Sequence, residues 1–471
     1  MDEYLDLSNS DITSLPADIG KFENLKRLNL RSTPITDFTG LEQLTTLEEL
    51  NLDGCFLPSN DIEKIGKLKN LKRLTMGFNV LFEIPDFIFQ LTDLRVLSLA
   101  NCNISELSPK IGQLVNLEEL KLSGNKYLEV LPEEITTLRN LRKLTLEWTG
   151  VKELPEGFDN LTNLRKLHLP CVLGKKALDK IYKFLELESL HVVECKRISL
   201  LKIFKMTNLR DLNISGIDID AIPPEIANLT HLRKLSCENN KLTALPSVIA
   251  QMQTIEVLRL LNNRFYDVPR EIYQLSNLRI LGLAHNKISR LSSKLCRMIN
   301  LQQLDFEDNA IAEIPKKFDQ LINLQTLYIK KNMLFGFPQV LCYLPKLAIL
   351  EIGENKICSI SPDIGKMTAL TRLHMESGNI TNIPPEIGRL VNLTELRLRD
   401  NYIRDVPPSI GQLKNLVYLD LARNRLYDLP LEISQLSNLR DLLLDDNRLT
   451  SIPDEIKTMP GLSVYAAYNS H

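Results

Sequence analysis

The sequence predicts an α/β solenoid, a curved, horseshoe-like stack of short repeats with a parallel sheet on its concave side. One apolar pattern recurs along the whole chain with a spacing of about 23 residues, and a period in this range is typical of solenoid proteins. Each copy also contains an apolar–polar–apolar triplet, the alternation that indicates a short strand. No segment remains for a linker or a second core, so we expect one domain over residues 1–471 with about 20 repeats.

Two consecutive copies define the repeat, which we number from its first apolar residue as position 1. Positions 1, 4, 6, 11 and 14 are apolar, and position 9 is most often asparagine. In one copy these six positions hold Leu278, Leu281, Leu283, Ile288, Leu291 and Asn286. In the next copy they hold Leu301, Leu304, Phe306, Ile311, Ile314 and Asn309. The pattern is that of the leucine-rich repeat.

The two halves of the repeat predict different structures. Positions 4 to 6 form a strand, and successive strands stack in parallel roughly 4.7–4.9 Å apart. Proline at position 15, as in Pro246, Pro269, Pro407 and Pro430, then turns the chain. Only about eight residues remain for the return, which are too few for an α-helix of ordinary length. We therefore expect short irregular or 3-10 segments on the convex side.

Asparagine at position 9 is predicted to satisfy backbone groups that have no partner in the sheet. Its amide can both donate and accept hydrogen bonds within its own repeat and to the neighbouring repeat. Residues with smaller polar side chains stand at this position in five repeats: Thr33, Cys55, Cys102, Thr149 and Cys195. Three further repeats have Val172, Ile217 and Gly378 there, whose side chains cannot replace the amide. The Leu-Pro turn is also missing after Leu164 and Leu187. We therefore predict the least regular repeats in 164–231.

Charge and composition exclude several classes of partner. The net charge is −2 with 25% charged residues, so nucleic acid, which needs a basic excess, is not an expected partner. A basic face within this neutral average is the alternative. The sequence contains no run of eighteen apolar residues, so we expect no membrane insertion. Met1 leads almost directly into the first repeat, which predicts that the chain has no signal peptide.

The eight cysteines are spread singly over the repeats. Several occupy position 9 or a core position, such as Cys55, Cys102 and Cys237, and neither end carries a cysteine-rich cap. We therefore expect reduced thiols and a cytoplasmic location. The sequence has no phosphate-binding glycine loop, no Gly-x-Ser-x-Gly and no His-Glu-x-x-His motif. Enzymatic activity, a cofactor and a metal are consequently not expected.

Outward-facing side chains beside the strands form the predicted binding surface. The aromatic, histidine and arginine residues expected to contact a partner are Trp148, His168, His191, Tyr328, His374, Arg397, Tyr402, Tyr418 and Arg423. His168 and His191 occupy position 5 of consecutive repeats, which predicts that they lie side by side. A polar ladder is the alternative role for this pair. A metal site there would need a third ligand, for which Cys171 is the candidate.

The phrases at 387–393 (Ile-Gly-Arg-Leu-Val-Asn-Leu) and 410–416 (Ile-Gly-Gln-Leu-Lys-Asn-Leu), together with Leu-Pro-x-x-Ile throughout, have a family likeness. They resemble the intracellular leucine-rich repeat proteins of the Ras-pathway scaffold, plant Ras-group and Scribble–Erbin polarity-scaffold type. The resemblance implies a protein-binding scaffold, with small GTPases and phosphatases among the family's partner classes. The matching residues are structural, so the resemblance assigns no binding residue.

Two functions are open at this point. The first is a scaffold or adaptor whose concave face holds a folded partner protein. The second is the ligand-sensing array of a larger immune receptor or bacterial effector, because Asp2 at position 1 and an end soon after Leu462 suit an array excised from a longer chain. We place the partner contact within 141–231, where local rules are broken beneath Trp148 and the histidine pair. The alternative contact lies near Tyr402 and Arg423.

Overall fold

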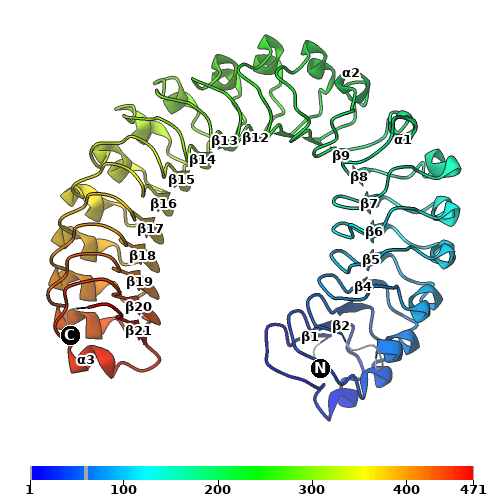
Figure 1. Ribbon diagram of the computed structural model, residues 1–471, viewed down its shortest axis with the longest axis horizontal. Coiled ribbons are helices and arrows are strands. Elements are labelled where there is room, and N and C mark those ends of the chain that lie inside the picture. The colour runs from blue at the N-terminus through cyan, green and yellow to red at the C-terminus, as the bar shows by residue number, and fades with distance from the viewer. Residues whose placement is uncertain (1–2, 58–61, 470–471) are drawn as a thin grey trace. The chain divides into compact units, whose positions relative to one another are not determined.

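The computed structural model describes residues 3–57 and 62–469 (Figure 1). The predicted domain ends at 1 and 471, and Asp2 at position 1, lie outside the described residues. The chain forms two compact units. Unit 1 comprises Met1–Asp218 and Glu225–Leu232, and unit 2 comprises Ile219–Pro224 and Arg233–His471. The expectation of a single domain over the whole chain remains a prediction.

In unit 1 each described repeat contributes a strand of three residues, and consecutive strands pair in parallel. Equivalent repeat positions lie opposite one another, as Leu5 and Leu28 do. The strands are β1 (Tyr4–Asp6), β2 (Arg27–Asn29), β3 (Glu49–Asn51), β4 (Arg73–Thr75), β5 (Val96–Ser98), β6 (Glu119–Lys121), β7 (Lys143–Thr145), β8 (Lys166–His168), β9 (Ser189–His191) and β10 (Asp211–Asn213).

Unit 2 repeats the same arrangement, with its strands on the inner side of the curve that its repeats describe (Figure 1). Its strands are β11 (Lys234–Ser236), β12 (Val257–Arg259), β13 (Ile280–Gly282), β14 (Gln303–Asp305), β15 (Thr326–Tyr328), β16 (Ile349–Glu351), β17 (Arg372–His374), β18 (Glu395–Arg397), β19 (Tyr418–Asp420), β20 (Asp441–Leu443) and β21 (Ser463–Tyr465). The predicted solenoid with a parallel sheet is confirmed.

Short 3-10 helices form most of the return segments, as the length of the repeat predicted. They are η1 (Ile19–Lys21), η2 (Leu41–Gln43), η3 (Ile62–Lys67), η4 (Asp86–Gln90), η5 (Pro109–Gln113), η6 (Glu133–Thr137), η7 (Glu156–Asn160), η8 (Pro224–Asn228), η9 (Ser247–Gln251), η10 (Arg270–Gln274), η11 (Leu295–Arg297), η12 (Phe318–Gln320), η13 (Gln339–Tyr343), η14 (Pro362–Lys366), η15 (Pro385–Arg389), η16 (Pro408–Gln412) and η17 (Leu431–Gln435). The proline of the Leu-Pro turn commonly stands directly before the helix, as Pro430 does before η17.

Two repeats of the irregular stretch carry α-helices instead. These helices are α1 (Lys175–Ile181) and α2 (Leu200–Ile203), and both follow strands whose repeats lack the Leu-Pro turn. Both return segments make i→i−4 hydrogen bonds, such as the one that Tyr182 N donates to Leu178 O over 3.2 Å. A third short helix, α3 (Asp454–Lys457), lies near the C-terminus.

The asparagine at position 9 links consecutive repeats, as predicted. Asn263 shows the pattern: its Nδ2 donates to Leu260 O in its own repeat and to Cys237 O in the preceding repeat. Its Oδ1 accepts from Leu242 N of the preceding repeat over 3.0 Å. Thr149, which replaces the amide, donates only to Leu146 O of its own repeat through its hydroxyl. The replacement by threonine therefore removes side-chain bonds between repeats, whereas the cysteines at position 9 keep one, as Cys55 Sγ does to Leu30 O of the preceding repeat.

Position 8 of the repeat adopts a left-handed backbone conformation in both units. Asn239 and Asn262 fit this conformation with φ values of 55° and 51°. Trp148 and Arg423 hold the same conformation with φ values of 59° and 53°, although bulky side chains disfavour it. Among the described residues, no helix is long and apolar enough to cross a membrane.

Candidate functional site

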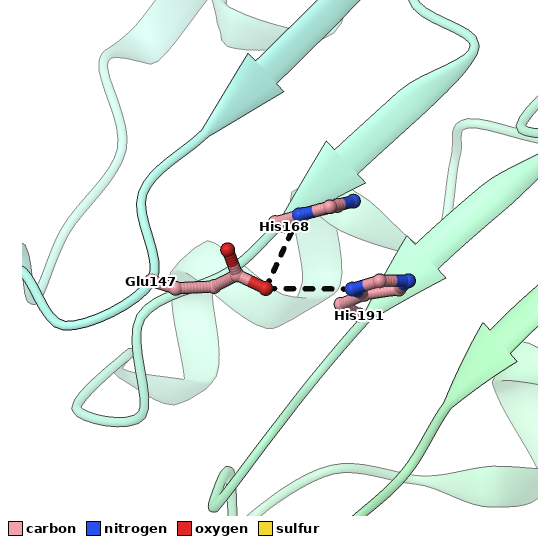
Figure 2. A group of neighbouring side chains, drawn as sticks. All are labelled: Glu147, His168 and His191. Carbon is pink, nitrogen blue, oxygen red and sulfur yellow. Dashed lines mark hydrogen bonds and ion pairs between the residues drawn. The ribbon is translucent and has the colours of Figure 1, made fainter. Parts of the chain in front are cut away.

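Three side chains of unit 1 meet on the strand face, as Figure 2 shows. His168 ends β8 and His191 ends β9, and the strand register places the two residues opposite each other, as their shared position 5 predicted. Their rings stack with centroids 3.8 Å apart and planes 13° apart. Glu147, at position 7 of the preceding repeat, reaches across from the loop after β7. The ligand atoms of the three residues all lie within 4.8 Å of one another.

One carboxylate oxygen joins the two rings. Oε1 of Glu147 lies 3.1 Å from Nδ1 of His168 and 3.4 Å from Nδ1 of His191. An ionised carboxylate only accepts hydrogen bonds, so both Nδ1 atoms carry the proton when these two contacts are hydrogen bonds. The side chains of His168, His191 and Glu147 are 16%, 21% and 23% exposed, respectively. All three side chains are therefore largely buried but still partly open to solvent.

The charges in this cluster stabilise one another. Burial raises the pKa of the Glu147 carboxyl, but hydrogen bonds from His168 and His191 outweigh this effect and lower it to about 2. Burial lowers the pKa of His191, but the neighbouring carboxylates of Asp211 and Glu147 outweigh it and raise the pKa to about 9. At neutral pH the cluster therefore holds a carboxylate next to a protonated His191.

Asp211 approaches His191 from the other side of its ring. Its Oδ1 lies 3.6 Å from Nε2 of His191, just beyond hydrogen-bonding distance. That Nε2 atom is buried and has no hydrogen-bond partner among the described residues. His191 thus presents one nitrogen to Glu147 and the other to Asp211, which starts β10.

In unit 2 the position-5 side chains of five consecutive strands form a column. Strand register aligns Tyr328, Glu351, His374, Arg397 and Asp420 across β15 to β19. Three of the residues predicted as partner contacts therefore share one column: Tyr328, His374 and Arg397. The pKa of the Tyr328 hydroxyl is raised, mainly by burial.

The carboxylates around His374 are placed differently from those around the unit 1 pair. Glu351 Oε1 lies 3.5 Å from Nδ1 of His374, whereas Glu395 Oε1 lies 3.1 Å from its Nε2. The two carboxylates therefore face opposite edges of one ring. His374 is 8% exposed, so this ring contributes little to the accessible surface.

Two arginine–tyrosine pairs lie near the C-terminal part of the unit 2 column, one at strand positions and one in the loops after β18 and β19. The guanidinium carbon of Arg397 lies 5.1 Å from the ring centroid of Tyr418, and that of Arg425 lies 4.3 Å from the ring of Tyr402. Arg423 lies further along the loop edge, with Nε 3.5 Å from Asp446 Oδ2. Such a cation–π contact contributes about 0.5–1 kcal/mol at an exposed site. The predicted residues Arg397, Tyr402 and Tyr418 thus belong to two arginine–tyrosine pairs.

Trp148 is 60% exposed and directly follows Glu147 in the chain. Glu147 and Asp211 were not predicted, although both stand at outward positions of repeats next to the histidines. Cys171 was the candidate for a third ligand, but Glu147 takes that place in the described group. The sequence did contain a signal for this site: a carboxylate at position 7 of one repeat, followed by histidines at position 5 of the next two repeats.

Models of known families match large parts of both units. The family described as leucine-rich repeat region matches residues 83–197 and 266–384. The family described as leucine rich repeat matches 368–426 and 391–449, and that described as leucine rich repeats (2 copies) matches 3–43. The subfamily of Ras-pathway and polarity scaffolds is not distinguished by these matches.

Relatives with a known description share only part of their length with this chain. The adenylate cyclase of Schizosaccharomyces pombe is 31% identical over 155 residues, which make up 31% of this chain and 9% of the cyclase. A putative disease resistance protein of Arabidopsis thaliana is 29% identical over 222 residues, 46% of this chain and 18% of that protein. The chain thus spans less than a fifth of the length of either relative.

Solved structures of similar fold include plant receptors. The plant peptide hormone receptor RGFR1, in complex with RGF2, is 27% identical with a TM-score of 0.57, covering 99% of this chain and 80% of that chain. The LRR ectodomain of the receptor kinase GASSHO1/SCHENGEN3 from Arabidopsis thaliana, in complex with CASPARIAN STRIP INTEGRITY FACTOR 2, is 25% identical with a TM-score of 0.55, covering 99% and 64%. The fold, the repeat pattern and the family models agree that this chain is built of leucine-rich repeats.

Proposed function

We propose that this chain binds a partner protein on the surface of unit 2 formed by β18, β19 and the loops that follow them, which is the alternative to a contact within 141–231. The observation that supports the proposal is the two arginine–tyrosine contacts, Arg397 with Tyr418 and Arg425 with Tyr402. Tyrosine and arginine supply a large share of the binding energy at protein interfaces. Side chains that are already held in place lose less conformational entropy when a partner docks. The surface is therefore suited to binding rather than to chemistry.

The role that we propose for this binding is that of a cytoplasmic scaffold or adaptor. The thiols support the cytoplasmic location, because Cys55 and Cys102 lie buried at position 9, with their Sγ atoms beside carbonyl oxygens rather than beside another cysteine. The resemblance to Ras-pathway and Scribble–Erbin repeats suggests small GTPases or phosphatases as partner classes.

A ligand-sensing array of a larger receptor or effector is the second candidate. It is favoured by the relatives, because the chain matches less than a fifth of the cyclase and of the disease resistance protein. Two structural neighbours are described as complexes with RGF2 and CASPARIAN STRIP INTEGRITY FACTOR 2. An extended ligand would lie along the position-5 column of unit 2 under this alternative.

Affinity capture from extract of the source cells tests the proposal. The double variant Tyr402→Ala/Arg425→Ala removes one arginine–tyrosine pair from the surface. We expect it to retain at most a tenth of the partner captured by the wild type, because truncating an interface anchor costs about 2 kcal/mol or more. If the chain is instead the ligand-sensing array of a larger receptor or effector, the protein identified in the captured fraction would be the ligand of that array.

The chain offers a matched control in the same unit. Lys287 stacks on Tyr266 with its Nζ 5.4 Å from the ring centroid, away from β18 and β19. The variant Tyr266→Ala/Lys287→Ala should capture as much partner as the wild type, and circular dichroism should show all variants folded. If Trp148→Ala abolishes capture while Tyr402→Ala/Arg425→Ala leaves it intact, the partner contacts unit 1 and the proposal is wrong.

A further inference from the structure

We propose that Glu147, His168 and His191 form a binding site for a divalent transition-metal ion, with Zn²⁺ as the representative ion. Two imidazoles and one carboxylate are a donor set that zinc and related ions use in proteins. Among the described residues, this is the one group of histidine, cysteine and acidic side chains whose ligand atoms converge within 4.8 Å. The site is independent of the partner surface proposed in unit 2.

The two distances from Glu147 to the histidines suit a tetrahedral ion. Zinc binds histidine nitrogen at about 2.0–2.1 Å and carboxylate oxygen at about 2.0–2.2 Å, so two ligands of one tetrahedron lie roughly 3.3–3.5 Å apart. Glu147 Oε1 lies 3.1 Å and 3.4 Å from the two Nδ1 atoms. An ion can therefore replace the shared protons with little movement of the backbone.

The strands hold the ligands in place before an ion arrives. His168 and His191 stand opposite each other on paired strands, and their spacing is set by the sheet. The rings are nearly parallel, so each must rotate about its Cβ–Cγ bond to direct its lone pair at a shared ion. That torsion has a broad energy minimum. The side of the cluster open to solvent leaves room for water or a partner's ligand at the fourth position.

Asp211 supplies the outer contact that metal-binding histidines usually have. When Nδ1 of His191 binds an ion, its Nε2 carries the proton and points to the Oδ1 of Asp211, which lies 3.6 Å away. A small movement brings this pair into hydrogen-bonding distance. Nε2 of His191, buried without a hydrogen-bond partner among the described residues, thus gains an acceptor in the metal-bound state.

The other clusters of histidine and carboxylate lack this convergence. His285 lies 2.8 Å from Asp308 through Nδ1, and no second histidine completes a described group there. His374 has its two carboxylates on opposite ring nitrogens, so a single ion cannot reach both. These two histidines therefore serve as matched controls within the same chain.

Zn²⁺ titration of the EDTA-stripped full chain by calorimetry tests the site, in a Cys358→Ser background that removes the exposed thiol. We expect one high-affinity equivalent in this background. His168→Gln and His191→Gln should each weaken it at least about 10-fold, and Asp211→Asn by a smaller factor. Trp148, the single tryptophan, directly follows Glu147 and should lose fluorescence when Co²⁺ is added.

His285→Gln and His374→Gln should bind Zn²⁺ as the parent chain does. Circular dichroism and thermal unfolding check that each variant is folded. If a histidine variant is unfolded, Glu147→Gln, which keeps the shape of the side chain, takes its place. A double variant His168→Gln/His191→Gln that binds Zn²⁺ as tightly as the parent, or a control variant that loses binding, would overturn the assignment.

Discussion

His191 in unit 1 and His374 in unit 2 occupy equivalent places in their repeats, yet their surroundings differ. Each stands at position 5, and each has a carboxylate from position 3 of the next repeat beside its Nε2: Asp211 at 3.6 Å and Glu395 at 3.1 Å. In the preceding repeat, position 5 is His168 in unit 1 and Glu351 in unit 2. The two places thus share the carboxylate beside Nε2 and differ in the residue that the preceding repeat supplies.

The difference shows how a repeat scaffold gives different functions to the same position. One repeat further back, position 7 is Glu147 in unit 1 and Lys330 in unit 2. One carboxylate oxygen of Glu147 contacts both histidines. Lys330 instead forms salt bridges with Glu354 and Glu376. The two clusters thus differ at two residues, one at position 5 and one at position 7.

The largest effect is expected from the leucines that anchor the two histidines. Leu190 and Leu373 stand at position 4 directly before them and are fully buried. Leu190→Ala and Leu373→Ala should each destabilise their own unit by about 3–5 kcal/mol, because each leaves a cavity in the core. Hydrogen exchange should show the loss in the repeats around the substitution. A loss spread evenly over both units would show that the units unfold together.

Transplanting the unit 1 pattern into unit 2 should create a new metal site. The double variant Lys330→Glu/Glu351→His places the three ligand types at the equivalent positions, with Glu395 already beside His374. We expect Zn²⁺ binding by unit 2 to increase about 100-fold, equivalent to about 2.7 kcal/mol. Calorimetry in a His168→Gln/His191→Gln background measures it. An unchanged affinity would show that strand register and residue type are not sufficient.

High pH should weaken unit 1 when metal is absent. The pKa of His191 in the folded chain, about 9, lies above its ordinary value of 6.5. The stability contributed by its charged form is therefore complete below pH 6.5 and is lost as the pH rises through 9. After allowance for solvent screening, we expect a loss of about 1 kcal/mol relative to His191→Gln. Thermal unfolding of the wild type and of His191→Gln in EDTA, at pH 6.5 and at pH 9, measures this loss. If both chains lose the same stability between the two pH values, the prediction is contradicted.

The smallest effect concerns the left-handed backbone at position 8. Trp148→Asn in unit 1 and Arg423→Asn in unit 2 replace bulky residues with one that tolerates positive φ. Each should stabilise its unit by up to about 1 kcal/mol, measured as a rise in the unfolding midpoint. The gain at Arg423 should be smaller, because its exposed contact with Asp446 is also lost. A lower midpoint for Trp148→Asn would mean that the indole stabilises unit 1 by packing.

The fold was largely predictable from the sequence because the same apolar pattern recurs in each repeat and specifies the same local structure. The strand positions, the short returns and the role of Asn263 and its equivalents follow from local spacing. The α-helices α1 and α2 were not predicted: the missing Leu-Pro turn marked an irregularity but did not specify what replaces the 3-10 helix. The pairing of His168 with His191 followed from position 5, whereas the reach of Glu147 did not. Its side chain crosses diagonally to the neighbouring strands, and spacing alone does not give that direction.

The asparagine ladder also sets an order of events during synthesis. Asn263 donates to Cys237 O and accepts from Leu242 N, and both partners lie in the repeat that precedes it in the chain. Asn447 does the same for Leu421 O and Leu426 N. The inward-facing backbone groups of a newly made loop therefore have no hydrogen bonds to this asparagine until the next repeat has been synthesised. At 5–20 residues per second, one repeat of about 23 residues takes roughly 1–5 s, so the newest loop of the growing chain is always the least protected one.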